Sequence, residues 1–88
     1  MIGEVTIEDV IKGDYSPHES YIRVGDKDIF FGDLNDSRDR ISINVIGLVD
    51  GERFIMNCEV SIDFLKQEQC IPFLISQWMG SVNRRINK

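Results

Sequence analysis

The chain has 88 residues, of which 42% are hydrophobic and 28% are charged, and it carries a formal net charge of −5 at pH 7. These values fit one globular domain, which we expect to span residues 1–88, and they exclude a disordered chain. No run approaches the ~20 apolar residues of a membrane-spanning helix, and the first residues lack the basic and apolar regions of a signal peptide. We therefore expect a cytoplasmic protein that makes no membrane contact.

The N-terminal segment carries signals for both a helix and a strand. Thr6 and Asp9 are spaced as in a helix capping arrangement, and Gly13 is a typical residue at a helix end. The apolar residues at positions 7, 10 and 11 have helical spacing. Residues 4–7 also alternate between polar and apolar side chains, as a strand does. Between these alternatives we favour a short helix.

A first hairpin follows. Residues 20–24 and 28–31 have the alternating pattern of strands, and residues 25–27 between them favour a tight turn. Pairing across this turn places on one face Ile22, Val24, Ile29 and Phe31. The opposite face then holds Tyr21, Arg23, Asp28 and Phe30. Residues 14–19 and 32–39 are rich in turn-forming residues, and we expect both to be loops.

The strongest local signal lies in the middle of the chain, where residues 40–49 and 52–62 flank Asp50-Gly51. Both turn residues tolerate positive φ, so this dipeptide favours a two-residue hairpin turn. Pairing Val49 with Glu52 then puts apolar residues or glycine opposite each other on one face: Gly47 with Phe54, Val45 with Met56, Ile43 with Cys58 and Ile41 with Val60. The other face is mostly polar, apart from the pair of Ile46 and Ile55 and from Leu48. Gly47 leaves room for the ring of Phe54 to lie across the strand.

The C-terminal part has the pattern of an amphipathic helix, and Pro72 suits its first turn. Arg84, Arg85 and Lys88 complement the negative end of that helix. Its expected apolar stripe consists of Ile71, Leu74, Ile75, Trp78, Met79, Val82 and Ile86. Within it, we assign Trp78 to the core and take Met79 as the better candidate for exposure. Residues 63–69 predict a separate helical turn or two.

These elements predict an α+β fold. An antiparallel sheet of about four strands, formed by the two hairpins, packs its apolar face against the amphipathic C-terminal helix. A short N-terminal helix or strand completes the domain.

No pattern of catalytic or metal-binding residues is complete. We interpret the single histidine, His18, as a surface residue, and the two separated cysteines, Cys58 and Cys70, as buried free thiols. Residues 33–39 alternate acidic and polar side chains as a calcium loop does, but Arg38 stands where that loop needs glycine. The chain also lacks a glycine-rich phosphate loop. We therefore expect no cofactor, no metal ion and no enzymatic activity.

The acidity is confined to one part of the chain. The first 39 residues hold ten acidic and four basic side chains, whereas the remainder holds five acidic and six basic. An acidic surface attracts a basic partner and repels nucleic acid, so we do not expect direct nucleic-acid binding. Our candidate partner-binding residues are aspartates of loops and turns and apolar residues of the second sheet face: Asp26, Asp28, Asp33, Asp36, Asp39, Tyr21, Phe30, Ile46 and Ile55.

Small size, localised acidity and incomplete chemistry favour an acidic protein-binding module. An inhibitor, antitoxin, immunity protein or phage-type accessory protein works in this way, by occluding a basic surface of another protein. The first alternative is a structural subunit or homo-oligomer, for instance a homodimer formed through the second sheet face or through an unpaired edge strand. A small enzyme or metal-binding protein is the remaining alternative.

Overall fold

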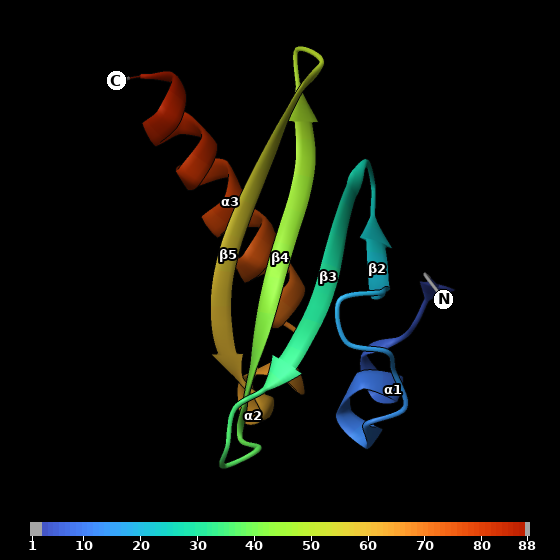
Figure 1. Ribbon diagram of the computed structural model, residues 1–88. Helices are drawn as coiled ribbons and strands as arrows, with labels where there is room; N and C mark the ends of the chain where they lie inside the picture. The colour runs from blue at the N-terminus through green and yellow to red at the C-terminus, as the bar shows by residue number, and fades with distance from the viewer. Residues whose placement is uncertain (1–2, 88) are drawn as a thin grey trace.

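The computed structural model describes residues 3–87 (Figure 1). In chain order the elements are β1 (Gly3–Glu4), α1 (Ile7–Lys12), β2 (Ser20–Val24), β3 (Lys27–Leu34), β4 (Arg40–Val49), β5 (Glu52–Ser61), α2 (Ile62–Leu65) and α3 (Cys70–Ile86). The strands form one sheet in the order β1-β2-β3-β4-β5, so neighbours in the chain are neighbours in the sheet. The α+β fold with α3 against a mostly antiparallel sheet is confirmed, with five strands instead of about four.

The β4–β5 hairpin has the register that the turn predicts. Asp50 and Gly51 both adopt positive φ, of 52° and 81°, and Val49 pairs with Glu52 directly beside them. All the pairs that follow along the two strands match, down to Ile41 with Val60. Such a turn has a twist that suits the strands on either side.

The β2–β3 hairpin confirms the predicted faces, because Tyr21 pairs with Phe30 around a Gly25-Asp26 turn. The predicted loop at residues 32–39 is wrong in its first part, since β3 continues to Leu34. The register between β3 and β4 shifts between Phe31 and Leu34, which is a β-bulge. Gly32 lies in this bulge, where a Cβ atom would clash with the hydroxyl of Ser42.

At the N-terminus the favoured helix is confirmed, and a strand precedes it. In α1 the Thr6 hydroxyl accepts from the Asp9 N–H and the Asp9 carboxylate accepts from the Thr6 N–H, which completes a capping box. Gly13 ends the helix with a φ of 81°. The two residues of β1 pair in parallel with the start of β2 and account for the fifth strand.

The core lies between α3 and the inner face of the sheet. Ile29, Phe31, Ile41, Ile43 and Val45 line that face and are fully buried. The helix contributes residues spaced by four: Cys70, Leu74, Trp78 and Val82. The predicted exposure of Met79 is confirmed, whereas the predicted stripe is wrong at Ile86, because each of these two side chains is 54% exposed. Ile86 is the last residue of α3, and Figure 1 shows this end of the helix projecting beyond the β5 side of the sheet. None of the helices within residues 3–87 has the length and apolarity that crossing a membrane requires.

Trp78 occupies the space that Gly47 leaves open. A Cβ atom at Gly47 would lie 2.6 Å from Cζ2 of Trp78, so the indole lies against bare backbone of β4. The indole N–H donates to the carbonyl of Phe54 at 3.0 Å, and the Lys27 ammonium lies 5.0 Å from the ring centre. The ring over Gly47 is therefore that of α3, where the sequence suggested Phe54 of the neighbouring strand.

Candidate functional site

The structure divides the five candidate aspartates between the two ends of β3. Asp26 and Asp28 lie at the turn that starts β3, whereas Asp33 lies near its end and Asp36 and Asp39 lie in or beside the loop that follows. Asp28 and Asp33 are five strand positions apart, which corresponds to roughly 17 Å. These residues therefore form two separate acidic groups and not one surface.

Three of these aspartates pair with bases of the same chain. Asp26 lies 2.9 Å from the ammonium of Lys27, and this hydrogen bond is the main reason why the pKa of Asp26 is lowered. Asp28 binds Arg23 at 2.8 Å across the hairpin. The carboxylate of Asp33 lies 3.0 Å from His18 Nε2. Asp39 accepts a hydrogen bond from the side-chain amide of Asn35 at 2.8 Å. A base beside each carboxylate weakens the electrostatic attraction that these aspartates exert on an approaching basic partner.

The four apolar candidates lie on the outer face of the sheet, as predicted from the strand alternation. Tyr21 and Phe30 contact each other with ring centroids 5.4 Å apart, and Ile46 pairs with Ile55. The two pairs lie in adjacent rows of the sheet and are diagonal to each other. The remaining positions of these rows hold polar pairs, Arg23 with Asp28 and Asn44 with Asn57. Apolar and polar pairs therefore alternate on the outer face, and the four apolar candidates do not form one continuous apolar patch.

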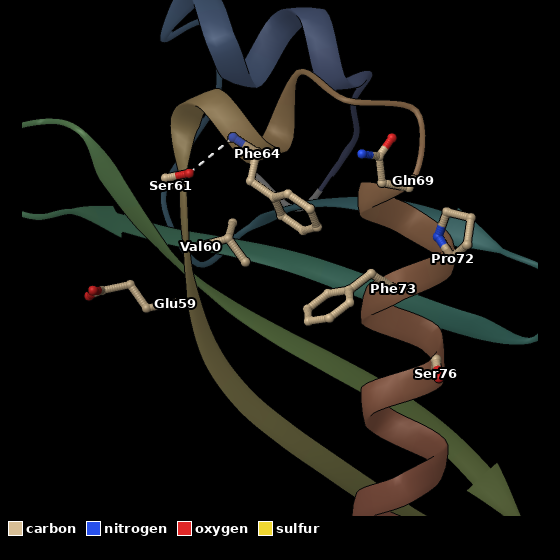
Figure 2. Close-up of a pocket in the computed structure, with 8 residues that line it drawn as sticks. All are labelled: Glu59, Val60, Ser61, Phe64, Gln69, Pro72, Phe73 and Ser76. Atoms are coloured by element: carbon tan, nitrogen blue, oxygen red, sulfur yellow. Dashed lines mark hydrogen bonds between the residues drawn. The ribbon is translucent and has the colours of Figure 1, made fainter.

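A different surface combines apolar side chains with a hollow. A cavity of about 650 Å³ opens between β5, α2 and α3. It is lined by Glu59, Val60, Ser61, Phe64, Gln69, Pro72, Phe73 and Ser76. Figure 2 shows the side chains of Phe64, Val60 and Phe73, from three different elements, pointing toward one another. The rings of Phe64 and Phe73 pack edge to face with their centroids 5.2 Å apart, and the side chain of Phe73 remains 45% exposed.

Local sequence explains how the two rings come together. The Ser61 hydroxyl caps α2 by accepting from the N–H of Phe64 at 3.0 Å, so the chain leaves β5 directly into a helical turn. α2 ends after one turn, and α3 begins at Cys70 with Pro72 in its first turn. Phe64 and Phe73 therefore face each other across the short connection between the two helices.

The hollow continues along β5 toward the C-terminal end of α3. A second cavity of about 470 Å³ shares Glu59, Val60 and Phe73 with the first. Its other lining residues are Met56, Asn57 and Cys58 of β5 and Gln77, Ser81, Arg84 and Arg85 of α3. The residues from the helix recur every three or four positions and so lie on one face. We call the two cavities together the β5–α3 groove; it is apolar near α2 and basic near the end of α3.

One wall of this groove is the free edge of the sheet, because β5 has a strand on one side only. A two-residue turn makes Val49 and Glu52 a hydrogen-bonded pair, and bonded and non-bonded pairs alternate along an antiparallel hairpin. The odd-numbered residues of β5 therefore direct their main-chain groups away from β4. Two side-chain contacts agree with this: Arg85 donates to the carbonyl of Ile55 at 2.7 Å, and Arg40 donates to that of Glu59 at 3.2 Å.

The potential metal ligands and thiols of residues 3–87 are dispersed or buried. No group of three or more His, Cys, Asp or Glu side chains within residues 3–87 is arranged to hold a metal ion. Cys58 is half-buried and Cys70 is buried, both as free thiols, and burial raises the pKa of each. A thiol with a raised pKa is a poor nucleophile at neutral pH. His18 is exposed, as expected.

Phe64 and Phe73 were not among the candidates from the sequence, and an unpaired edge strand was expected only as a surface for assembly. Phe73 offered one signal, because it is a large aromatic residue of the helix that lies outside the apolar stripe. Comparison of the chain with family models, with curated proteins and with solved structures gives no match. The groove must therefore be interpreted from its own geometry.

Proposed function

We propose that this chain is a small protein-binding module whose binding site is the β5–α3 groove. The observation that carries the proposal is the open apolar hollow at Phe64 and Phe73, which adjoins an unpaired sheet edge. Partly exposed aromatic residues in a concave site are typical anchors of protein interfaces. The site thus differs from the acidic surface that the sequence suggested, while the class of function is the same.

The acidic residues retain a part in this proposal. A net charge of −5 attracts partners with a basic surface over distances longer than a contact, and this raises the association rate at low salt. The groove supplies the contacts that hold the partner after it arrives. Binding to an inhibitor-type or accessory module of this kind would occlude the bound part of the partner.

The test is a pull-down from native lysate with the wild-type chain and two variants, Phe73→Ser and Met79→Ser. Both wild-type side chains are exposed apolar residues of α3, at 45% and 54%, but only Phe73 lines the groove. We expect a partner that Met79→Ser retains and Phe73→Ser loses, and whose capture weakens at high salt. A set of captured proteins that is identical for all three chains would refute the proposal.

Self-association through the outer sheet face is the second candidate. It is favoured by two side chains on that face, Leu48 and Ile55, which are 59% and 42% exposed. Sedimentation velocity of the wild type and of Leu48→Ser tests it. A dimer that Leu48→Ser weakens supports an assembly role, and a wild-type monomer at high concentration rules it out.

A further inference from the structure

The free edge of β5 is open over only part of its length. At one end, the carbonyl of Ile55, which points away from β4, accepts a hydrogen bond from the guanidinium of Arg85. Farther along, the carbonyl of Glu59 already accepts from Arg40, and the strand ends at Ser61. Between these two arginine contacts, the N–H and the carbonyl of Asn57 and the N–H of Glu59 point away from β4. Outward groups in this alternation match the groups that an extended chain presents. The open stretch therefore has the length and chemistry for a short added strand.

We propose that the partner segment binds as an extended strand antiparallel to β5, with an apolar side chain at Phe64 and Phe73 and an acidic side chain at Arg84. The inference rests on the proposed function, because it states how the partner fills the same groove. Adding a strand to an exposed sheet edge is a general mode of peptide recognition, in which main-chain hydrogen bonds supply affinity and pockets select alternate side chains.

Charge complementarity specifies the acidic residue. Arg84 is an exposed residue that lines the groove, and no carboxylate lies within ion-pair distance of it among residues 3–87. Arg85 beside it already donates to Ile55. A guanidinium that no carboxylate of residues 3–87 pairs with, at the basic end of the groove, selects a carboxylate by bidentate hydrogen bonding. It also lies in the last turn of α3, where the helix dipole favours the cation.

The helix sets the spacing of the two selected side chains. Phe73 and Arg84 are eleven helical positions apart, which corresponds to about 16 Å or about five residues of strand. β5 runs from the arginine end of the groove toward Phe64, so an antiparallel segment runs the opposite way. Side chains on the same face of a strand are an even number of positions apart, so the recognised sequence has an apolar residue about four or six positions before an acidic one.

A second copy of this chain fits the edge poorly. A two-fold pair of β5 strands centred on the open stretch would be centred on Asn57. That symmetry brings Ile55 of one copy beside Glu59 of the other, and Arg85 and Arg40 already occupy the carbonyls of these two residues. The two copies would also bring together two net charges of −5.

The experiment selects binders from a random library of displayed peptides of about ten residues, the upper end of strand lengths. Enriched peptides are synthesised, and one main-chain nitrogen at a time is methylated. We expect methylation at alternate positions to weaken binding about tenfold, because it removes one hydrogen bond to β5, and methylation at the intervening positions to have little effect. The amide proton of Asn57 should gain protection from hydrogen exchange in the complex.

Charge variants test the acidic position. Arg84→Glu should weaken binding of the selected peptide about tenfold, whereas Arg53→Glu makes the same change of charge on β5 outside the groove and should leave it unchanged. A library without enriched binders, or binders indifferent to methylation, overturns the added strand. If a lysate partner is still lost with Phe73→Ser in that case, the protein-binding function survives and only this inference fails.

Discussion

Nη2 of Arg85 donates a 2.7 Å hydrogen bond to the main-chain carbonyl of Ile55, thirty residues away in the chain. The contact joins the last turn of α3 to the free edge of β5. An exposed sheet edge is a template for unwanted pairing, and a positively charged side chain laid across it is a common protection. α3 therefore has two roles: it buries the inner face of the sheet, and it shields the free edge of β5 near Ile55.

Replacing Arg85 should destabilise the fold more than replacing its neighbour. Arg85→Ala removes the hydrogen bond to Ile55 and should lower the free energy of unfolding by about 1 kcal/mol. Arg84→Ala removes the same charge from the same helix end, so the effect on the helix dipole cancels in the comparison. Urea denaturation followed by the fluorescence of Trp78 measures both. Equal losses would mean that the contact at Ile55 adds nothing to stability.

Gly47 should not tolerate a side chain, because Trp78 lies over it. In Gly47→Ala the new Cβ would approach Cζ2 and Cη2 of Trp78 at 2.6 Å and 3.0 Å, and such overpacking costs about 1–3 kcal/mol. Gly80→Ala is the control, because a Cβ there meets only the flexible end of Arg84 at 3.4 Å. In a helix that change should stabilise by about 0.5–1 kcal/mol. Calorimetric melting of the two variants should show shifts of opposite sign.

Thr6 should be important for α1. Thr6→Ala removes the hydroxyl that accepts from the N–H of Asp9 and should cost about 1 kcal/mol. Thr6→Ser keeps the hydroxyl and should restore most of that loss. Chemical denaturation of the three chains gives the comparison. A serine variant as unstable as the alanine variant would indicate that the cap is not the cause.

Alkaline pH should destabilise the protein through its buried thiols. Burial raises the pKa of Cys58 and Cys70 above their unfolded values, so the unfolded chain loses these protons first as the pH rises. Stability should be complete below the unfolded pKa of about 8.5 and should fall as the pH passes through the folded values. The raised pKa of Tyr15, due mainly to burial, adds to this fall at higher pH.

Denaturant titrations at pH 7 and at about pH 10, above the ordinary thiol pKa, measure this decline. Cys58→Ala removes one of the titrating groups, so its stability should fall less between the two conditions than that of the wild type. The quantity compared is the change in the free energy of unfolding between the two pH values. A packing loss that is the same at both pH values therefore does not affect it. An equal fall in the two chains would contradict the conclusion that the thiols cause the loss of stability at alkaline pH.

Sequence reasoning was most successful where one local signal determined many positions. Asp50-Gly51 favours a two-residue turn, and the turn then determines every pair of β4 and β5. The capping residues of α1 are equally local. The extension of β3 to Leu34 was missed because glycine and aspartate at positions 32 and 33 are typical of loops, whereas here they form a bulge.

The candidate site was harder to predict because it is a tertiary feature. Phe64 and Phe73 meet only because α2 stops after one turn. The periodicity of each helix predicts its buried face but not the relative orientation of two helices joined by a turn. The separation of Asp28 from Asp33 likewise depends on β3 remaining extended between them. Composition showed the acidity, but only the strand geometry shows that it is divided.

The sequential order of the strands has a consequence for folding kinetics. Each antiparallel pair joins segments that are adjacent in the chain, so each closes a short loop. A two-residue turn joins β4 and β5, as one joins β2 and β3, and the β4–β5 hairpin has the longer ladder of pairs. Proteins rich in such local contacts fold quickly. We expect this hairpin to be formed in the folding transition state and α3 to dock later. Changes at Asp50 would then slow refolding, whereas changes at Val82 would mainly accelerate unfolding.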